Sequence, residues 1–196
     1  MTHLKNTYYT LRHGQSKANT LQIVLSDLHE GQKSEYALTE EGKRQVTESA
    51  KKALTDHLLD SNTIIISSPL SRCRESAQIA KQILNGKGDI VFDERLKERW
   101  FGDWEKQHND AYKHVWKDDA LDENHTNKNV ESALDVQKRT MSLIHDLEKR
   151  YTDKNILLVS HGDALQILQT GISKIPASKH REINHLETAE IRKLNP

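Results

Sequence analysis

Residues 7–14 read Thr-Tyr-Tyr-Thr-Leu-Arg-His-Gly, an apolar run that ends in Arg12 and His13. A second apolar run, residues 156–162, reads Ile-Leu-Leu-Val-Ser-His-Gly and brings His161 to the same position before a glycine. Runs rich in β-branched and aromatic residues are typical of strands. The ligand site of an open α/β sheet lies beyond the carboxyl ends of its strands. The two stretches therefore predict a site in which two imidazoles and an arginine perform covalent chemistry on an anion.

The remainder of the chain alternates strands with helices. We expect strands over residues 6–12, 63–67, 89–93, 155–160 and 187–194. We expect helices from the N-cap Thr39 to about residue 59, from Pro69 to Asn85 and Gly86, over about residues 130–151, and, shorter, after His161 and Gly162. Strands alternating with helices indicate an α/β fold, a three-layer α/β/α sandwich with helices on both faces of a mainly parallel central sheet.

Length and charge limit the class of protein. The chain has 196 residues, so we expect residues 1–196 to form a single domain. Lysine plus arginine and aspartate plus glutamate both number 29, which gives no support for a nucleic-acid or membrane partner. No apolar stretch approaches the ~20 residues of a membrane helix, and the single cysteine, Cys73, excludes an internal disulfide. We therefore expect a cytoplasmic protein.

Residues 106–129 form a highly polar stretch, which we interpret as a helix plus a long surface loop and as a candidate lid. Its acidic residues are Asp118, Asp119, Asp122 and Glu123. If these carboxylates overhang the mouth of the site, they should repel substrates that carry several negative charges. A solvated loop far from the site is the alternative interpretation.

Attack by a histidine on a phosphoryl group needs a neutral imidazole, fixed cations around the phosphoryl oxygens and an acid for the leaving oxygen. His13 is the candidate nucleophile. Arg12 and Arg72 can each bind phosphate oxygens through two hydrogen bonds, and His161 can add a third cation. Glu98 is the candidate acid. Its competitors nearby are Glu94, Asp103 and Glu105.

Smaller groups complete the candidate phosphate pocket. Asn19 offers an amide donor, and Ser16 belongs to the same short motif after His13. Gly14 and Gly162 carry no Cβ, so we expect their backbone N–H groups to approach the anion where helices begin. The pocket should therefore surround a phosphate group on several sides.

Two further sets of residues are assigned less directly. We expect Lys17 and Arg99 to be solvated charges rather than residues at the rim of the pocket. The aromatic side chains of Trp100, Phe101 and Trp104 fit a core and a substrate pocket equally well.

The remaining histidines show no metal-ligand spacing, so we predict no metal site. We expect them, His125 included, to lie at the surface. His180 and His185, near the last strand, are the expected exceptions.

Five motifs follow one another along the chain. They are Arg12-His13-Gly14-Gln15-Ser16 with Asn19, Leu38-Thr39 with Gly42, Ser67-Ser68-Pro69-Leu70-Ser71-Arg72, Glu98 with Phe101-Gly102-Asp103-Trp104-Glu105, and Ser160-His161-Gly162. Together and in this order they resemble the motifs of the histidine phosphatase superfamily, which includes the cofactor-dependent phosphoglycerate mutases. The resemblance implies an α/β/α fold and a phosphohistidine on His13. It also implies a phosphate pocket of Arg12, Arg72 and His161, with Glu98 as proton donor. It implies no metal ion, and we expect no cofactor.

Departures from the mutases favour a phosphomonoesterase. Only 62 residues lie between Glu98 and His161 (residues 99–160), and they contain no Arg-Arg pair, whereas mutases usually carry a longer insertion with paired arginines. Phe101 stands where mutases tend to have tyrosine. Lys106 stands where many phosphatase relatives have glycine, which bears on the mouth of the site rather than on the chemistry.

We therefore expect a histidine acid phosphatase-type phosphohydrolase whose partner is a small phosphorylated metabolite. A phosphoglycerate mutase-like phosphotransferase is the first alternative, and a non-catalytic phospho-ligand-binding protein is the second. The complete set of His13, Arg12, Arg72, Glu98 and His161 argues against the second. The sequence selects neither one phosphate ester nor one oligomeric state.

Overall fold

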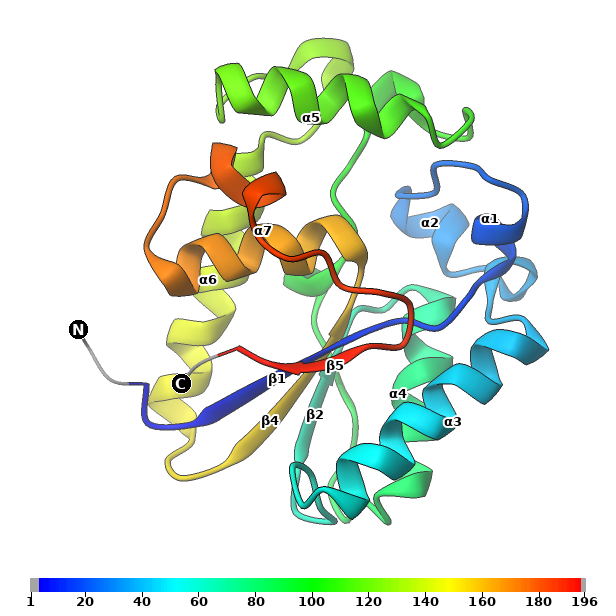
Figure 1. The fold of residues 1–196 in the computed structure, drawn as a ribbon, viewed down its shortest axis with the longest axis vertical. Coiled ribbons are helices and arrows are strands. Elements are labelled where there is room, and N and C mark those ends of the chain that lie inside the picture. Colours follow the sequence, from blue (N-terminus) through cyan, green and yellow to red (C-terminus); the bar gives the residue numbers. More distant parts are fainter. Residues whose placement is uncertain (1–3, 195–196) are drawn as a thin grey trace.

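The computed structural model describes residues 4–194, in which five strands form one sheet in the order β3-β2-β4-β1-β5 (Figure 1). The strands are β1 (Thr7–Arg12), β2 (Ile64–Ser67), β3 (Val91–Phe92), β4 (Asn155–Ser160) and β5 (Ile191–Lys193). The pairs β1–β4, β2–β4 and β2–β3 are parallel, and β5 pairs with β1 antiparallel. The predicted α/β fold with a mainly parallel sheet is confirmed.

Helices lie on both faces of this sheet. The α-helices are α1 (Lys17–Thr20), α2 (Leu28–Gly31), α3 (Glu40–Thr55), α4 (Ser71–Ile83), α5 (Ala111–Leu121), α6 (Ala133–Arg150) and α7 (Gly162–Ser173). Short 3₁₀ helices are η1 (Ser34–Tyr36), η2 (Glu94–Leu96), η3 (Gly102–Trp104), η4 (Asn127–Asn129) and η5 (Ala177–Glu182). Figure 1 shows α5 at the top, apart from the layers around the sheet. Within residues 4–194, no helix combines the length and apolarity needed to cross a membrane.

Alternation along the strands builds the two halves of the core. In β4, Leu157 and Val159 belong to the cluster that contains residues of α3 and α4. Ile156 and Leu158 belong to the cluster that contains residues of α6 and α7. Successive side chains of a strand point to opposite faces, so an unbroken apolar run is what a sheet covered on both faces requires.

Several predicted boundaries move, and the backbone gives the reason. The predicted helix from Thr39 ends at Thr55, because His57 takes a left-handed φ of 56° soon after it. The predicted strand over residues 187–194 shrinks to Ile191–Lys193, because the N–H of Glu190 donates to the carbonyl of Glu187 in a turn. The predicted helix over residues 130–151 becomes Ala133–Arg150, capped by Ser132. The predicted strand over residues 89–93 becomes the two-residue β3.

Parallel pairing brings three strand ends together. In the register of β1 and β4, Arg12 lies opposite Ser160, and the N–H of His13 donates to the carbonyl of Ser160 at 3.0 Å. The N–H of Ser68, after β2, donates to the carbonyl of Val159 at 2.9 Å. The residues that follow β1, β2 and β4 therefore lie at one edge of the sheet, as predicted.

The loop after β1 is held by close contact with the first turn of α3. A Cβ placed on Gly42 would lie 2.0 Å from the carbonyl oxygen of Gln15, and one placed on Gly14 would lie 2.3 Å from the carbonyl oxygen of Gly42. Thr39 caps the helix by accepting from the N–H of Gly42 at 3.0 Å. Any side chain at either glycine would push α3 away from the loop that carries His13.

We predict that Gly42→Ala destabilises the protein by at least ~1–3 kcal/mol, since overpacking of this size moves backbone rather than a flexible side chain. Gly88→Ala is the matched control, because a Cβ there meets no atom within 4 Å. Urea denaturation of both variants measures the difference. Equal stability of the two variants would contradict the assigned contact.

Candidate active site

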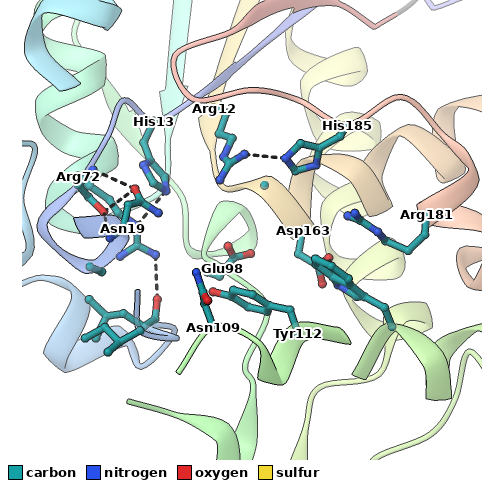
Figure 2. A pocket seen from close by; sticks show the side chains of 16 residues that line it. Arg12, His13, Asn19, Arg72, Glu98, Asn109, Tyr112, Asp163, Arg181 and His185 are labelled. Atoms are coloured by element: carbon teal, nitrogen blue, oxygen red, sulfur yellow. Dashed lines mark hydrogen bonds between the residues drawn. The ribbon is translucent and has the colours of Figure 1, made fainter. Parts of the chain in front are cut away.

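A pocket of about 220 Å³ opens beyond the carboxyl ends of β1 and β4 (Figure 2). This volume suits a small metabolite, because drug-sized ligands occupy pockets of roughly 300–1,000 Å³. Its lining residues are Arg12, His13, Ser16, Ala18, Asn19, Ile23, Leu25, Arg72, Glu98, Asn109, Tyr112, Trp116, Gly162, Asp163, Arg181 and His185. Of the predicted site residues, only Gly14 and His161 are not part of this lining.

His13 is held as a neutral imidazole. Its Nδ1–H donates to the carbonyl oxygen of Gly14 at 2.8 Å, and its Nε2 accepts from Nε of Arg72 at 3.1 Å. A carbonyl can only accept and a guanidinium can only donate, so these two partners define the tautomer. Burial, with the charges of Arg72 and Arg12, lowers the pKa of His13 well below its usual value. A nucleophilic lone pair on Nε2 is the result.

Two arginines of the pocket, Arg12 and Arg72, have buried N–H groups that lack a hydrogen-bond partner among residues 4–194. Arg72 donates through Nη2 to the carbonyl of Leu25 at 2.9 Å, and Arg12 donates through Nη1 to the carbonyl of Leu186 at 2.7 Å. Nη1 of Arg72 and Nε of Arg12 are buried and have no hydrogen-bond partner among residues 4–194. Buried donors are normally paired. An anion in the pocket would supply the missing acceptors.

His185 and Gly162 fix the position of Arg12. Nε2 of His185 lies 2.8 Å from Nη1 of Arg12, and burial with the charge of Arg12 lowers the pKa of His185. A Cβ on Gly162 would lie 3.3 Å from Cζ of Arg12, so the glycine lets the guanidinium lie over the first turn of α7. The predicted close approach at Gly162 therefore involves an arginine of this chain.

Glu98 is a buried carboxyl with one oxygen already engaged. Its Oε1 accepts from the N–H of Arg99 at 3.0 Å and from the N–H of Ala164, in the first turn of α7, at 3.3 Å. Burial, and secondly the negative charge of Asp163, raise the pKa of Glu98 to about 7, although Arg72 opposes the shift. A carboxyl with this pKa can hold a proton at neutral pH and release it. None of the competitors Glu94, Asp103 and Glu105 lines the pocket.

His161 lies next to the nucleophile as a buried imidazole. It is fully buried, its Nε2 lies 2.9 Å from Oγ of Ser68, and its ring meets that of His13 edge to face with centroids 5.2 Å apart. Burial, followed by the charge of Arg72, lowers the pKa of His161 well below its usual value. A neutral His161 therefore packs against the nucleophile, and its role as a cationic phosphate clamp stays a prediction.

Three smaller predictions also need correction or refinement. The N–H of Gly14 donates to Oγ of Ser76 at 3.3 Å and is directed away from the pocket, so Gly14 serves the contact with Gly42. Ser16 donates from both N and Oγ to Oδ1 of Asn19 at 2.9 Å and caps α1. Its hydroxyl proton is therefore used. The amide nitrogen of Asn19 is the group left for the pocket.

Residues 106–129 do reach the pocket, but through other side chains than predicted. Asn109, Tyr112 and Trp116 line it. Asp119 is fully buried and accepts from both Nη atoms of Arg99 at 2.6 and 2.7 Å. None of the four acidic residues of the segment lines the pocket, so the lining gives no support for repulsion of multiply charged substrates by these carboxylates.

Arg99 is fully buried and links several elements by hydrogen bonds and ion pairs, so our prediction that it is a solvated charge is wrong. Besides Asp119 in α5, it contacts Asp163 in α7 at 3.4 Å and donates to the carbonyl of Glu131 at 2.7 Å. His125, predicted at the surface, is also buried and lies 2.8 Å from Asp119. These contacts fasten α5 over the pocket.

The sequence interpretation missed Asn109, Tyr112, Trp116, Asp163 and Arg181. Asp163 directly follows the second His-Gly pair, which is a usable signal. The others carried no local signal. For the three aromatic residues, the structure favours the core over the substrate pocket. Trp100, Phe101 and Trp104 lie outside the pocket lining, and Phe101 is fully buried.

Comparison with known sequences points to one family. A family model described as "Histidine phosphatase superfamily (branch 1)" matches residues 8–196. The chain is 30% identical over 181 residues to "Probable phosphoglycerate mutase GpmB" of Enterobacter sp. (strain 638), covering 89% of this chain and 78% of that protein. The protein of the same name from Escherichia coli is also 30% identical.

Solved structures share the fold. A mycobacterial glucosyl-3-phosphoglycerate phosphatase, in complex with VO3, superposes with a TM-score of 0.75 and 22% identity, covering 95% of this chain and 91% of that chain. A phosphoserine phosphatase mutant from Entamoeba histolytica, in complex with phosphoserine, gives a TM-score of 0.74 and 24% identity, covering 95% and 88%. At these identities the likeness concerns the fold.

We predict that Glu98 titrates near pH 7 and that Asp163→Asn lowers its pKa, because the variant removes a negative charge that disfavours the ionised carboxyl. Carboxyl-carbon NMR of glutamate-labelled protein between about pH 4 and 9 follows the titration directly. Asp103→Asn, which removes a carboxylate outside the pocket lining, should leave the midpoint in place. A normal midpoint for Glu98, or one insensitive to Asp163→Asn, would refute the assigned electrostatics.

Proposed function

The chain belongs to the histidine phosphatase superfamily, and we propose that it is a metal-independent phosphomonoesterase that hydrolyses a small phosphorylated metabolite through a phosphohistidine on His13. One observation carries the proposal. His13 lines a pocket in which its Nε2 accepts from Nε of Arg72, while Arg12 and Arg72 each keep a buried donor without a partner among residues 4–194. Phosphoryl transfer to a histidine requires a neutral imidazole and cationic groups whose N–H donors are free to bind the phosphoryl oxygens.

In the first proposed step, Nε2 of His13 attacks the phosphorus atom and the bond to the leaving oxygen breaks. Arg72 gives up its bond to Nε2 and binds phosphoryl oxygens together with Arg12. Glu98 transfers its proton to the leaving oxygen, and the alcohol departs. Nδ1–H of His13 stays on the carbonyl of Gly14, which stabilises the positive charge that develops on the ring.

In the second proposed step, water attacks the phosphohistidine. The Glu98 carboxylate, left ionised by the first step, accepts a proton from the water, and the bond between phosphorus and Nε2 breaks. Inorganic phosphate forms and both residues return to their starting states. A pKa of about 7 lets one carboxyl serve as acid and then as base.

A phosphoglycerate mutase-like phosphotransferase is the second candidate, and the relatives named as probable phosphoglycerate mutases favour it. Such an enzyme returns the phosphoryl group to an organic hydroxyl before water attacks. The short spacing between Glu98 and His161 and the buried Phe101, which has no hydroxyl, support hydrolysis instead.

We also propose that residues 1–196 act as one domain in which residues 106–129 form a cover over the pocket. The support is the lining by Asn109, Tyr112 and Trp116, together with the buried pair of Arg99 and Asp119. This cover is fastened by an ion pair with both partners fully buried, so we infer a fixed wall rather than a loose loop.

We predict that the wild-type protein, assayed in a metal chelator, releases inorganic phosphate from small phosphomonoesters without accumulating an isomerised ester. Arg72→Ala should lower kcat/KM at least ~10-fold, since a charge-assisted hydrogen bond contributes about 1.5–3 kcal/mol. Arg74→Ala is the control, because Arg74 is exposed and lies over the ring of Phe92. A strict metal requirement would overturn the proposal, and isomerisation of 3-phosphoglycerate without hydrolysis would replace it by the phosphotransferase.

We predict that Glu98→Gln slows hydrolysis of alkyl phosphates by roughly 10²–10⁴, because an alkoxide leaving group needs a proton. The loss with p-nitrophenyl phosphate should be much smaller when transfer to His13 limits the rate, since p-nitrophenolate leaves as a stable anion. A burst of p-nitrophenol in the variant would identify slow dephosphorylation as the limiting step. Equal losses on both substrates without a burst would exclude Glu98 as the acid.

A further inference from the structure

Arg181 is a third pocket arginine, and the phosphate chemistry proposed above gives it no role. It belongs to η5 and lines the pocket (Figure 2), as does Trp116 of α5. Its Cζ lies 3.7 Å from the centroid of the Trp116 ring, and its Nη1 donates to Oε1 of Gln166. Gln166 is itself fixed, since its Nε2 donates to the carbonyl of Ile183 at 2.8 Å. The guanidinium is therefore held in place before any ligand binds.

Arg181 is also without an ion-pair partner. No carboxylate in residues 4–194 lies within 4 Å of its guanidinium, whereas the buried Arg99 pairs with Asp119 and the largely buried Arg139 pairs with Glu131. Burial lowers the pKa of Arg181, and Asp163 is the acidic group that opposes this shift.

The carboxylate of Asp163 is already engaged on both oxygens. Oδ1 accepts from Nε1 of Trp116 at 2.9 Å, and Oδ2 lies 3.4 Å from Nη1 of Arg99. Asp163, the acidic residue whose charge acts on Arg181, thus directs its carboxylate oxygens to Trp116 and Arg99. Arg181 is an exposed residue of the pocket lining, so a ligand can reach it. A fixed and unpaired guanidinium in a pocket is suited to bind an anionic group of a ligand.

Figure 2 places Arg181 on the side of Asp163 and His185, away from Arg72, with Arg12 between them. A phosphoryl group held by Arg12 and Arg72 on His13 would therefore leave Arg181 to the other end of the substrate. That end is the leaving group, whose oxygen receives the proton of Glu98.

We propose that Arg181 binds a carboxylate on the leaving group, so that the substrates are phosphate monoesters of small hydroxy acids or amino acids. The assignment rests on the proposed function for the position of the phosphoryl group. A planar guanidinium fork matches the two oxygens of a carboxylate. One positive charge balances one carboxylate, whereas a second phosphate dianion beside Asp163 would keep an uncompensated charge in a small pocket.

The test compares two esters that differ at one carbon, 3-phosphoglycerate with a carboxylate and glycerol 3-phosphate with a hydroxymethyl group. We expect the wild-type kcat/KM to favour 3-phosphoglycerate at least ~10-fold, the effect of one charge-assisted contact. Arg181→Gln should bring that ratio close to one, chiefly through KM. Arg181→Lys, which keeps the charge without the fork, should give an intermediate ratio. Lys179→Gln is the control, because Lys179 lies in the same η5 but outside the pocket lining and is paired with Glu182.

Calorimetric binding of the same two esters to His13→Ala gives a readout that does not need turnover. An unchanged preference in Arg181→Gln, or no preference in the wild type, would overturn the subsite. A preference for fructose 1,6-bisphosphate over both esters that is lost in Arg181→Gln would overturn the carboxylate assignment. A binding preference that depends on Arg181, in a protein that hydrolyses no ester, would refute the proposed hydrolysis and retain the subsite.

Discussion

The parallel pairing of β1 with β4 is the constraint on which the site depends. Its register sets Arg12 opposite Ser160, so His13 and His161 leave the sheet side by side. The pairing of β2 with β4 adds the loop that leads to Arg72, and α7 begins directly after His161 and supplies an N–H to Glu98. A shift of one residue in this register would send every strand side chain to the opposite face and separate the two imidazoles.

Burial gives the nucleophile and the acid opposite protonation states. The same low-dielectric pocket disfavours the charged form of each group, so the pKa of His13 falls while that of Glu98 rises. Arg72 and Arg12 reinforce the first shift, and Asp163 reinforces the second. The proposed mechanism needs a neutral imidazole and a protonated carboxyl together, and one environment favours both.

The features predicted from the sequence are those with local causes. The strand ends at His13 and His161 and the N-cap at Thr39 follow from short patterns, and the structure contains each of them. The features that were missed depend on partners distant in the chain. Arg99, in the loop between η2 and η3, is paired with Asp119 of α5 and contacts Asp163 of α7, whereas a lone charged residue in a sequence is ordinarily assigned to the surface. Arg181 likewise gains its position from Trp116 and Gln166. The lowered pKa of His161 depends on its burial and, after that, on the charge of Arg72, both of which come from the fold.

Direct trapping of the covalent intermediate tests the central claim, the role of His13. Wild-type protein mixed with a phosphomonoester labelled with ³²P and quenched within milliseconds should carry label that is stable in base and lost in acid. Digestion should place that label on the peptide that contains His13, and the His13→Ala variant should carry none. Label retained by His13→Ala, label on a different residue, or turnover with no labelled protein at any quench time would contradict the account.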